Sequence, residues 1–291
     1  IKSMTSLFKT KSGKKQILDF YDLKLKELNI PFTAQFIDTS YGKTHILETG
    51  NKSKPKLILV HGSNGNAPIA LETYSELLNH FHVIAIDVLA QPNKSETNRL
   101  NMKDTSYGIW ITEIIQSFGF KEVYMAGFSF GGLIIIKTLE HNTNLIKHAF
   151  LTAPAYIVNG NPIRALFNIF LPMKSFMRNG NPKKLKAFLN ALFTNPDDYA
   201  FNFLSVVLKE FDMDFSPIPT ITKTQAKNIT TPITIFAAKQ DIIFPGKKMI
   251  KRAKNIFPNI CKTVLLEKSK HVQNQHQNIQ IQNEILEILN K

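Results

Sequence analysis

The sequence predicts an α/β fold with a mostly parallel central sheet flanked by helices and a helical cap inserted late in the chain. Short apolar runs rich in β-branched residues alternate with helical stretches, which is typical of a parallel sheet covered on both faces. Between about residue 155 and residue 228 this alternation stops, and helical stretches rich in phenylalanine take its place. We therefore assign residues 1–154 and 229–291 to the sheet-containing core and residues 155–228 to the cap.

The first part of the chain predicts a helix and a hairpin. Residues 14–28 space their apolar side chains as an amphipathic helix does, and Pro31 ends this stretch. Two alternating segments follow, FTAQFIDTS and KTHILET, and they are joined by Tyr41 and Gly42. Alternation on both sides of a short turn that contains glycine predicts a β-hairpin.

The rest of the core repeats one unit of strand and helix. The runs KLILV and HVIAID are apolar at nearly every position, as expected of strands buried on both faces. The predicted strands lie at 56–60, 82–87, 122–127, 148–154, 233–238 and 261–267. The predicted helices lie at 68–79, 105–117, 131–140, 245–254 and 277–290.

The net charge is strongly positive, but the cations are scattered. The chain has 36 Lys and Arg against 22 Asp and Glu, which gives a formal charge of +14. The sequence shows no interleaved basic and aromatic motif of the usual nucleic-acid modules. We therefore interpret the charge as a solvated lysine-rich surface and expect no nucleic-acid partner. The alternative is a surface that binds nucleic acid or an anionic membrane.

Location is predicted from three weaker signals. No apolar run approaches the roughly 20 residues needed to span a bilayer, so we expect no transmembrane segment. Cys261 is the single cysteine, which rules out a disulfide within the chain and fits a reducing compartment. The first residues are basic without the apolar core of a signal peptide. These signals predict a cytoplasmic protein.

One serine occupies a position typical of a nucleophile. The pentapeptide Gly127-Phe128-Ser129-Phe130-Gly131 follows a predicted strand and opens a predicted helix. A sharp turn of this kind exposes a serine hydroxyl, and the flanking glycines avoid collisions that a Cβ would cause. The start of the helix also favours a developing negative charge. The alternative is that Ser129 is only a helix cap.

A serine nucleophile needs a base and a carboxylate that orients it. Asp241 and His271 each follow a late predicted strand, so both are expected at the carboxyl edge of the sheet with Ser129. The order Ser, Asp, His is the one associated with this type of turn. His276 is the rival to His271. The carboxylates that are less well placed than Asp241 are Asp197, Asp198, Asp212 and Asp214.

These residues resemble the α/β-hydrolase superfamily, in the branch of serine carboxylesterases with a helical cap. The resemblance covers nearly the whole chain, from the predicted hairpin to the last helix. The segment LILVHGSNGN (57–66) is similar to the family's oxyanion loop. By this resemblance, the backbone N–H groups of Ser63 and Phe130 hold the oxyanion that forms during the reaction.

A second family segment matches only in part. IAIDVLAQPNKSE (84–96) is similar to the family's D-x-x-G-x-G-x-S segment after the fourth strand. Ala90, Pro92 and Asn93 depart from the small-residue turns that are usual there. The resemblance therefore does not predict the backbone shape of this loop.

The function predicted from these residues is hydrolysis of a carboxylic ester or a related acyl compound. Ser129 is expected to attack the carbonyl, His271 to move the proton and Asp241 to hold the imidazole. No cofactor or metal is expected, and the partner is a small acyl substrate. Perhydrolases, carbon–carbon bond hydrolases and acyltransferases use the same triad and remain alternatives. A ligand-binding protein with little turnover is the alternative from another class.

Overall fold

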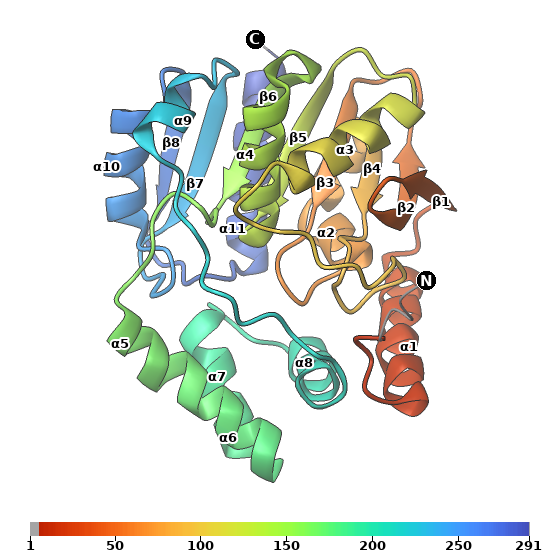
Figure 1. Cartoon of the computed structure of the whole chain (residues 1–291), viewed down its shortest axis with the longest axis vertical. Helices are drawn as coiled ribbons and strands as arrows, with labels where there is room; N and C mark the ends of the chain where they lie inside the picture. Colours follow the sequence, from red (N-terminus) through yellow and green to blue (C-terminus); the bar gives the residue numbers. More distant parts are fainter. Residues whose placement is uncertain (1–5, 291) are drawn as a thin grey trace.

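The structure, a computed structural model, describes residues 6–290 and contains one eight-stranded sheet (Figure 1). The strands are β1 (Thr33–Thr39), β2 (Gly42–Gly50), β3 (Lys56–Val60), β4 (His82–Ile86), β5 (Val123–Phe128), β6 (Ile146–Thr152), β7 (Ile233–Ala238) and β8 (Ile260–Leu266). Their order in the sheet is β1-β2-β4-β3-β5-β6-β7-β8. Strand β2 pairs antiparallel with β1 and β4, and the other neighbours are parallel. The predicted α/β class is confirmed.

Helices cover both faces of this sheet. The helices are α2 (Ala67–Thr73), α3 (Ser106–Ser117), α4 (Phe130–His141), α10 (Gly246–Ile256) and α11 (Gln275–Leu289). One apolar cluster joins α3, α4 and α10 to alternate strand residues such as Ile58 and Ile84, while another joins α2 and α11 to Leu57 and Val83. Because successive side chains point to opposite faces, the central strands must be apolar at every position.

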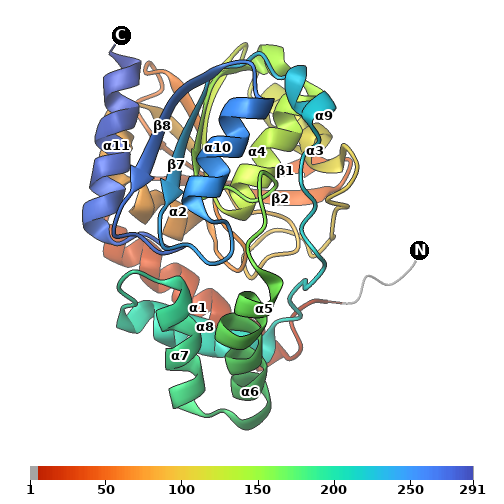
Figure 2. The same ribbon diagram turned by 90° about the vertical axis from the view of Figure 1, so that its left-hand side faces the viewer.

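A separate helical layer lies below the carboxyl edge of the sheet (Figures 1 and 2). Between β6 and β7 the chain forms α5 (Pro162–Ala165), a π-helical stretch (Leu166–Phe170), α6 (Leu171–Asn179), α7 (Pro182–Leu192), α8 (Asp198–Glu210) and α9 (Lys223–Lys227). We call residues 162–210 the helical layer. Side chains of α6, α7 and α8 pack into their own apolar cluster, which includes Phe176, Phe188 and Phe203.

The N-terminal helix joins this layer. Helix α1 (Lys11–Leu28) lies beside α8 (Figure 2), and Ile17 is buried in the cluster of the helical layer. It starts three residues earlier than predicted because the side chain of Thr10 accepts the N–H of Gly13 at 2.8 Å and caps it. No helix in residues 6–290 is both long enough and apolar enough to cross a bilayer.

Candidate active site

Ser129 lies in a strained turn between β5 and α4. Its backbone has φ 54° and ψ −112°, a region that residues with a Cβ rarely adopt. The turn is held by its neighbours, because the N–H of Ser129 donates to Thr152 O and the carbonyl of Ser129 accepts the N–H of Ala155, both at 2.9 Å. A Cβ at Gly131 would collide with the carbonyl oxygen of Val60. The sequence thus places glycine where α4 passes close to the backbone at the end of β3.

The structure brings the three predicted side chains into one row of hydrogen bonds. The Nε2 atom of His271 lies 2.9 Å from Ser129 Oγ, and its Nδ1 atom lies 2.7 Å from Asp241 Oδ2. All three residues are buried. The second oxygen of Asp241 accepts the N–H groups of Ile243 at 2.7 Å and Phe244 at 3.0 Å, which fixes the carboxylate against rotation. This geometry lets His271 accept the serine proton while Asp241 orients the ring.

Aromatic rings and the helical layer position His271. The rings of Phe128 and Phe244 lie 5.0 and 5.5 Å from the imidazole, centroid to centroid. The next residue, Val272, is hydrogen-bonded to the end of α7: its N–H donates to Leu192 O, and its carbonyl accepts both the N–H and the hydroxyl of Thr194. The loop that carries His271 is therefore tied to the helical layer through its backbone.

Thr194 is expected to support the activity by holding the loop of His271, without contacting the hydrogen-bonded side chains of Ser129, His271 and Asp241. Its hydroxyl donates to Val272 O at 2.8 Å and accepts the N–H of Lys270 at 3.0 Å, so it holds the loop on both sides of His271. Replacing it with valine removes both bonds at nearly constant volume, and we expect kcat/KM for an ester to fall about tenfold. Thr194→Ser keeps the hydroxyl and should stay near the parent. Equal activity of the Thr194→Val and Thr194→Ser proteins would contradict this role.

The two predicted oxyanion donors have free backbone N–H groups. Within residues 6–290, neither the N–H of Ser63 nor that of Phe130 has a protein acceptor. The loop around Ser63 is fixed at its far side, where Asn64 adopts φ 59° and donates its N–H to Gln91 Oε1 at 2.7 Å. An oxyanion hole requires free backbone donors of this kind, one at the start of α4 and one in the loop after β3.

His61 supports this loop as a neutral ring. Burial lowers the pKa of His61 below its ordinary value. Its Nε2 atom accepts the N–H of Val88 at 3.0 Å, so its proton is on Nδ1, which donates to Gly62 O at 2.7 Å. Val88 belongs to the segment that departs from the family pattern. There Ala90 adopts φ 58°, so alanine keeps a turn that glycine usually makes.

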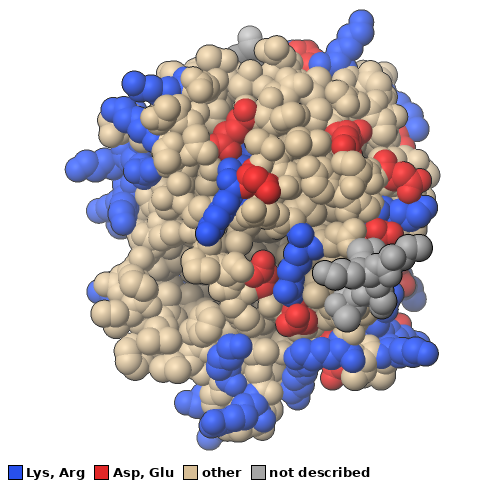
Figure 3. All heavy atoms as spheres, viewed as in Figure 1, with Lys and Arg blue, Asp and Glu red and all other residues tan. Residues whose placement is uncertain are grey.

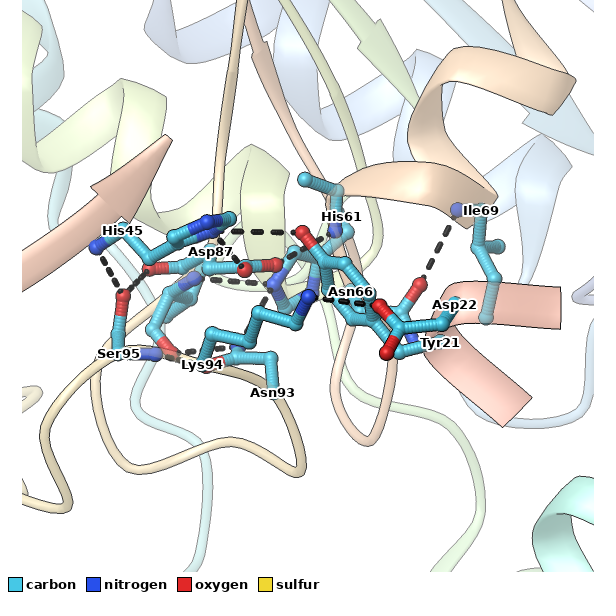
Figure 4. A network of polar contacts seen from close by, with 12 residues as sticks. Tyr21, Asp22, His45, His61, Asn66, Ile69, Asp87, Asn93, Lys94 and Ser95 are labelled. Atoms are coloured by element: carbon cyan, nitrogen blue, oxygen red, sulfur yellow. Dashed lines mark hydrogen bonds and ion pairs between the residues drawn. The ribbon is translucent and has the colours of Figure 1, made fainter. Parts of the chain in front are cut away.

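A buried polar network next to this loop was not anticipated from the sequence (Figure 4). Asp87 is fully buried at the end of β4, where its Oδ2 lies 2.8 Å from His45 Nδ1 and its Oδ1 accepts the N–H of Ala67 at 2.8 Å. The hydroxyl of Tyr21 in α1 lies 3.3 Å from the same His45 nitrogen. Burial, reinforced by Asp87, raises the pKa of Tyr21. The signal available in the sequence was an aspartate that ends an otherwise apolar strand.

The rival residues lie elsewhere. His276 is exposed in the first turn of α11, and Asp197 caps α8 by accepting the N–H of Ala200 at 2.7 Å. Asp198 is in the first turn of α8, Asp212 forms an ion pair with Arg99 at 3.4 Å, and Asp214 accepts the N–H of Ser216. Over the described range 6–290, no group of three or more His, Cys, Asp or Glu residues is arranged to hold a metal ion.

In sequence, the chain is similar to two curated carboxylesterases and to one family model. A family model described as the alpha/beta hydrolase fold matches residues 55–197. Carboxylesterase YbfK of Bacillus subtilis (strain 168) is 28% identical over 135 residues, a match that spans 46% of this chain and 46% of that protein. The uncharacterized carboxylesterase nap of the same organism is 20% identical over 271 residues, 88% of this chain and 86% of that protein.

Solved structures share this architecture over 96% of the chain. Naproxen esterase from Bacillus subtilis superposes with a TM-score of 0.84 and 18% identity, covering 96% of this chain and 99% of that one. Carboxylesterase CesB (YbfK) from Bacillus subtilis superposes with a TM-score of 0.81 and 18% identity, covering 96% and 98%. At this identity the likeness establishes a common fold, which extends through the helical layer as well as the sheet.

Proposed function

We propose that this enzyme, a carboxylesterase-like hydrolase with the α/β-hydrolase fold, cleaves a carboxylic ester through a covalent intermediate on Ser129. The observation that carries the proposal is the buried row from Ser129 Oγ through His271 to Asp241, with contacts of 2.9 and 2.7 Å. A serine hydroxyl is a poor nucleophile by itself, and a hydrogen-bonded, oriented imidazole is the group that activates it.

The proposed reaction proceeds in two halves. His271 Nε2 takes the proton of Ser129 as the oxygen attacks the ester carbonyl, and Asp241 stabilises the imidazolium that results. The N–H groups of Ser63 and Phe130 stabilise the tetrahedral oxyanion, each contributing about 3–4 kcal/mol to the lowering of the barrier. The intermediate then collapses, and His271 gives its proton to the departing alcohol. Water, deprotonated by His271, attacks the acyl-enzyme, releases the acid and restores Ser129.

Active-site labelling tests the proposal directly. The oxygen of an activated serine attacks the phosphorus of a fluorophosphonate and displaces fluoride, which leaves a phosphonate ester on the serine. Mass spectrometry of the labelled chain should therefore locate the adduct on the peptide that contains Ser129. Turnover of a chromogenic ester should disappear in proportion to labelling. Labelling of a different serine would reject the assignment, and labelling of Ser129 without ester turnover would favour a ligand-binding protein.

The helical layer is proposed to act as a lid that forms part of the acyl pocket. Its support is the attachment of Leu192 and Thr194 to the backbone beside His271, which places the end of α7 at the site. Residues 155–228, on this proposal, are the cap inserted into a core of residues 1–154 and 229–291.

The dependence of kcat/KM on the length of the acyl chain is expected to reveal an apolar acyl pocket. Each methylene that an acyl chain buries should contribute up to about 0.8 kcal/mol, so kcat/KM should rise from acetyl to medium-length esters. It should fall once the acyl chain outgrows the cavity. The competing possibility is that the aromatic residues of the layer serve only its own packing, as Phe176, Phe188 and Phe203 do. A flat profile across matched nitrophenyl esters would favour that possibility.

A further inference from the structure

The helical layer exposes an unusual stripe of large apolar side chains. Of the ten large apolar side chains that are exposed in residues 6–290, five lie within nine consecutive residues of α5 and its continuation into α6. They are Ile163, Leu166, Phe167, Phe170 and Leu171, which we call the apolar stripe. Their spacing of three and four residues places them along one side of a helix. Ile163 is 65% exposed and Phe167 62%, so the stripe is not part of the packed cluster beneath it.

One more aromatic side chain extends the stripe. Phe215, on the segment after α8, is exposed and packs edge-on against Phe170 with 5.3 Å between ring centroids. Lys174 Nζ lies 4.1 Å from the centroid of the Phe215 ring, so a cation borders the apolar surface directly. A contiguous apolar surface with a charged border is typical of an interaction site.

The helical segment that carries the stripe has charges of one sign only, whereas exposed Asp214 adjoins Phe215. Between Pro154 and Pro196 the chain has no acidic residue, and its cations are Arg164, Lys174, Arg178, Lys183, Lys184 and Lys186. Lys183 and Lys186 line a surface hollow. Asp197 and Asp198 line the same hollow, so their negative charges balance the two positive charges there. Arg164, Lys174 and Arg178 lie on the same helical segment as the stripe. In Figure 3 the surface over α5 is mostly uncharged, and lysine and arginine side chains gather toward the lower end of the layer.

We propose that the apolar stripe and its bordering cations form a docking surface for an anionic phospholipid bilayer. A helix that inserts apolar side chains at the headgroup boundary and presents Lys and Arg to lipid phosphates binds a membrane without crossing it. The net charge of +14 adds a long-range attraction to the same surface. A second copy of this chain fits less well because its cations would face those of the first. Nucleic acid fits less well because exposed Ile163 and Phe167 would meet phosphates.

Vesicle binding of the full chain provides the test. The chain should cosediment with vesicles of mixed phosphatidylglycerol and phosphatidylcholine, and much less with phosphatidylcholine alone. Added NaCl should weaken the binding because it screens the attraction. Strong binding to neutral vesicles, or none to the anionic ones, would overturn the proposal. The readout is binding, so it is independent of the proposed esterase activity.

Two variants and two matched controls locate the surface. Ile163→Ser combined with Phe167→Ser, and Arg164→Gln combined with Lys174→Gln and Arg178→Gln, should each weaken partitioning about tenfold or more. The controls remove exposed groups elsewhere. The apolar control is Leu23→Ser with Ile279→Ser, at residues that are 44% and 41% exposed, and the charge control is Lys247→Gln with Lys251→Gln and Lys254→Gln. Both controls should bind nearly as the parent does, and melting temperatures establish that all four proteins are folded.

Three outcomes would overturn the assignment. Equal losses in the lysine control and in the Arg164, Lys174 and Arg178 variant would show a general charge effect. Tighter binding to single-stranded DNA than to anionic vesicles, sensitive to the same variants, would indicate nucleic acid. A dimer in sedimentation velocity that Ile163→Ser with Phe167→Ser dissolves would identify the stripe as a contact between copies.

Discussion

Ester turnover by the Ser129→Ala protein is expected to fall by about 10³-fold or more, with the fold intact. The substitution removes the atom that is proposed to form the acyl-enzyme, and the remaining groups cannot replace it. The methyl side chain of alanine fits because serine already carries a Cβ in this turn. The backbone bonds to Thr152 and Ala155 do not involve the hydroxyl and are kept. kcat and KM should be measured with a chromogenic ester, and the melting temperature should change little.

A second serine serves as the matched control for this change. Ser205 in α8 donates its hydroxyl to Asn202 O within its own helix and is not a member of the hydrogen-bonded row of Ser129, His271 and Asp241. Ser205→Ala should keep the activity of the parent. A folded Ser129→Ala protein with near-normal turnover would reject the proposed mechanism, and so would continued fluorophosphonate labelling of that protein.

Replacement of His271 by alanine is expected to be nearly as damaging as loss of Ser129, again about 10³-fold or more in kcat. His271 is the side chain whose two ring nitrogens contact Ser129 Oγ and Asp241 Oδ2. Without it the serine proton has no acceptor, and the departing alcohol has no donor.

The rival histidine supplies the control here. His276 is exposed in the first turn of α11, so His276→Ala should leave most of the activity. Reversed phenotypes would transfer the role of base to His276.

The sequence determined the fold class because the signals for it are local. A short apolar run marks each buried strand, and the spacing of apolar residues marks each helix. Strands β3 to β8 therefore lie close to their predicted limits. The turn at Ser129 was equally visible, since its strand, its glycines and its helix are contiguous. The candidates Asp241 and His271 also followed from local position, because each lies in the loop that follows a strand, β7 ending at Ala238 and β8 at Leu266.

Which side chains from distant parts of the sequence come into contact depends on the tertiary packing. His271 is 142 residues from Ser129, and its approach depends on the crossover that puts β8 at the far side of β7. The network of Asp87, His45 and Tyr21 joins three elements that share no local pattern.

The same holds for α1, whose amphipathic sequence predicts a helix but not its partner, which is α8. The role of Thr194 could not be predicted from the sequence either, because no local pattern indicates that a threonine after a helix will hydrogen-bond to the loop of His271. Spacing along the chain encodes which face of an element is apolar. Which surfaces then come together is set by packing among elements far apart in sequence, and that is where the proposed site is assembled.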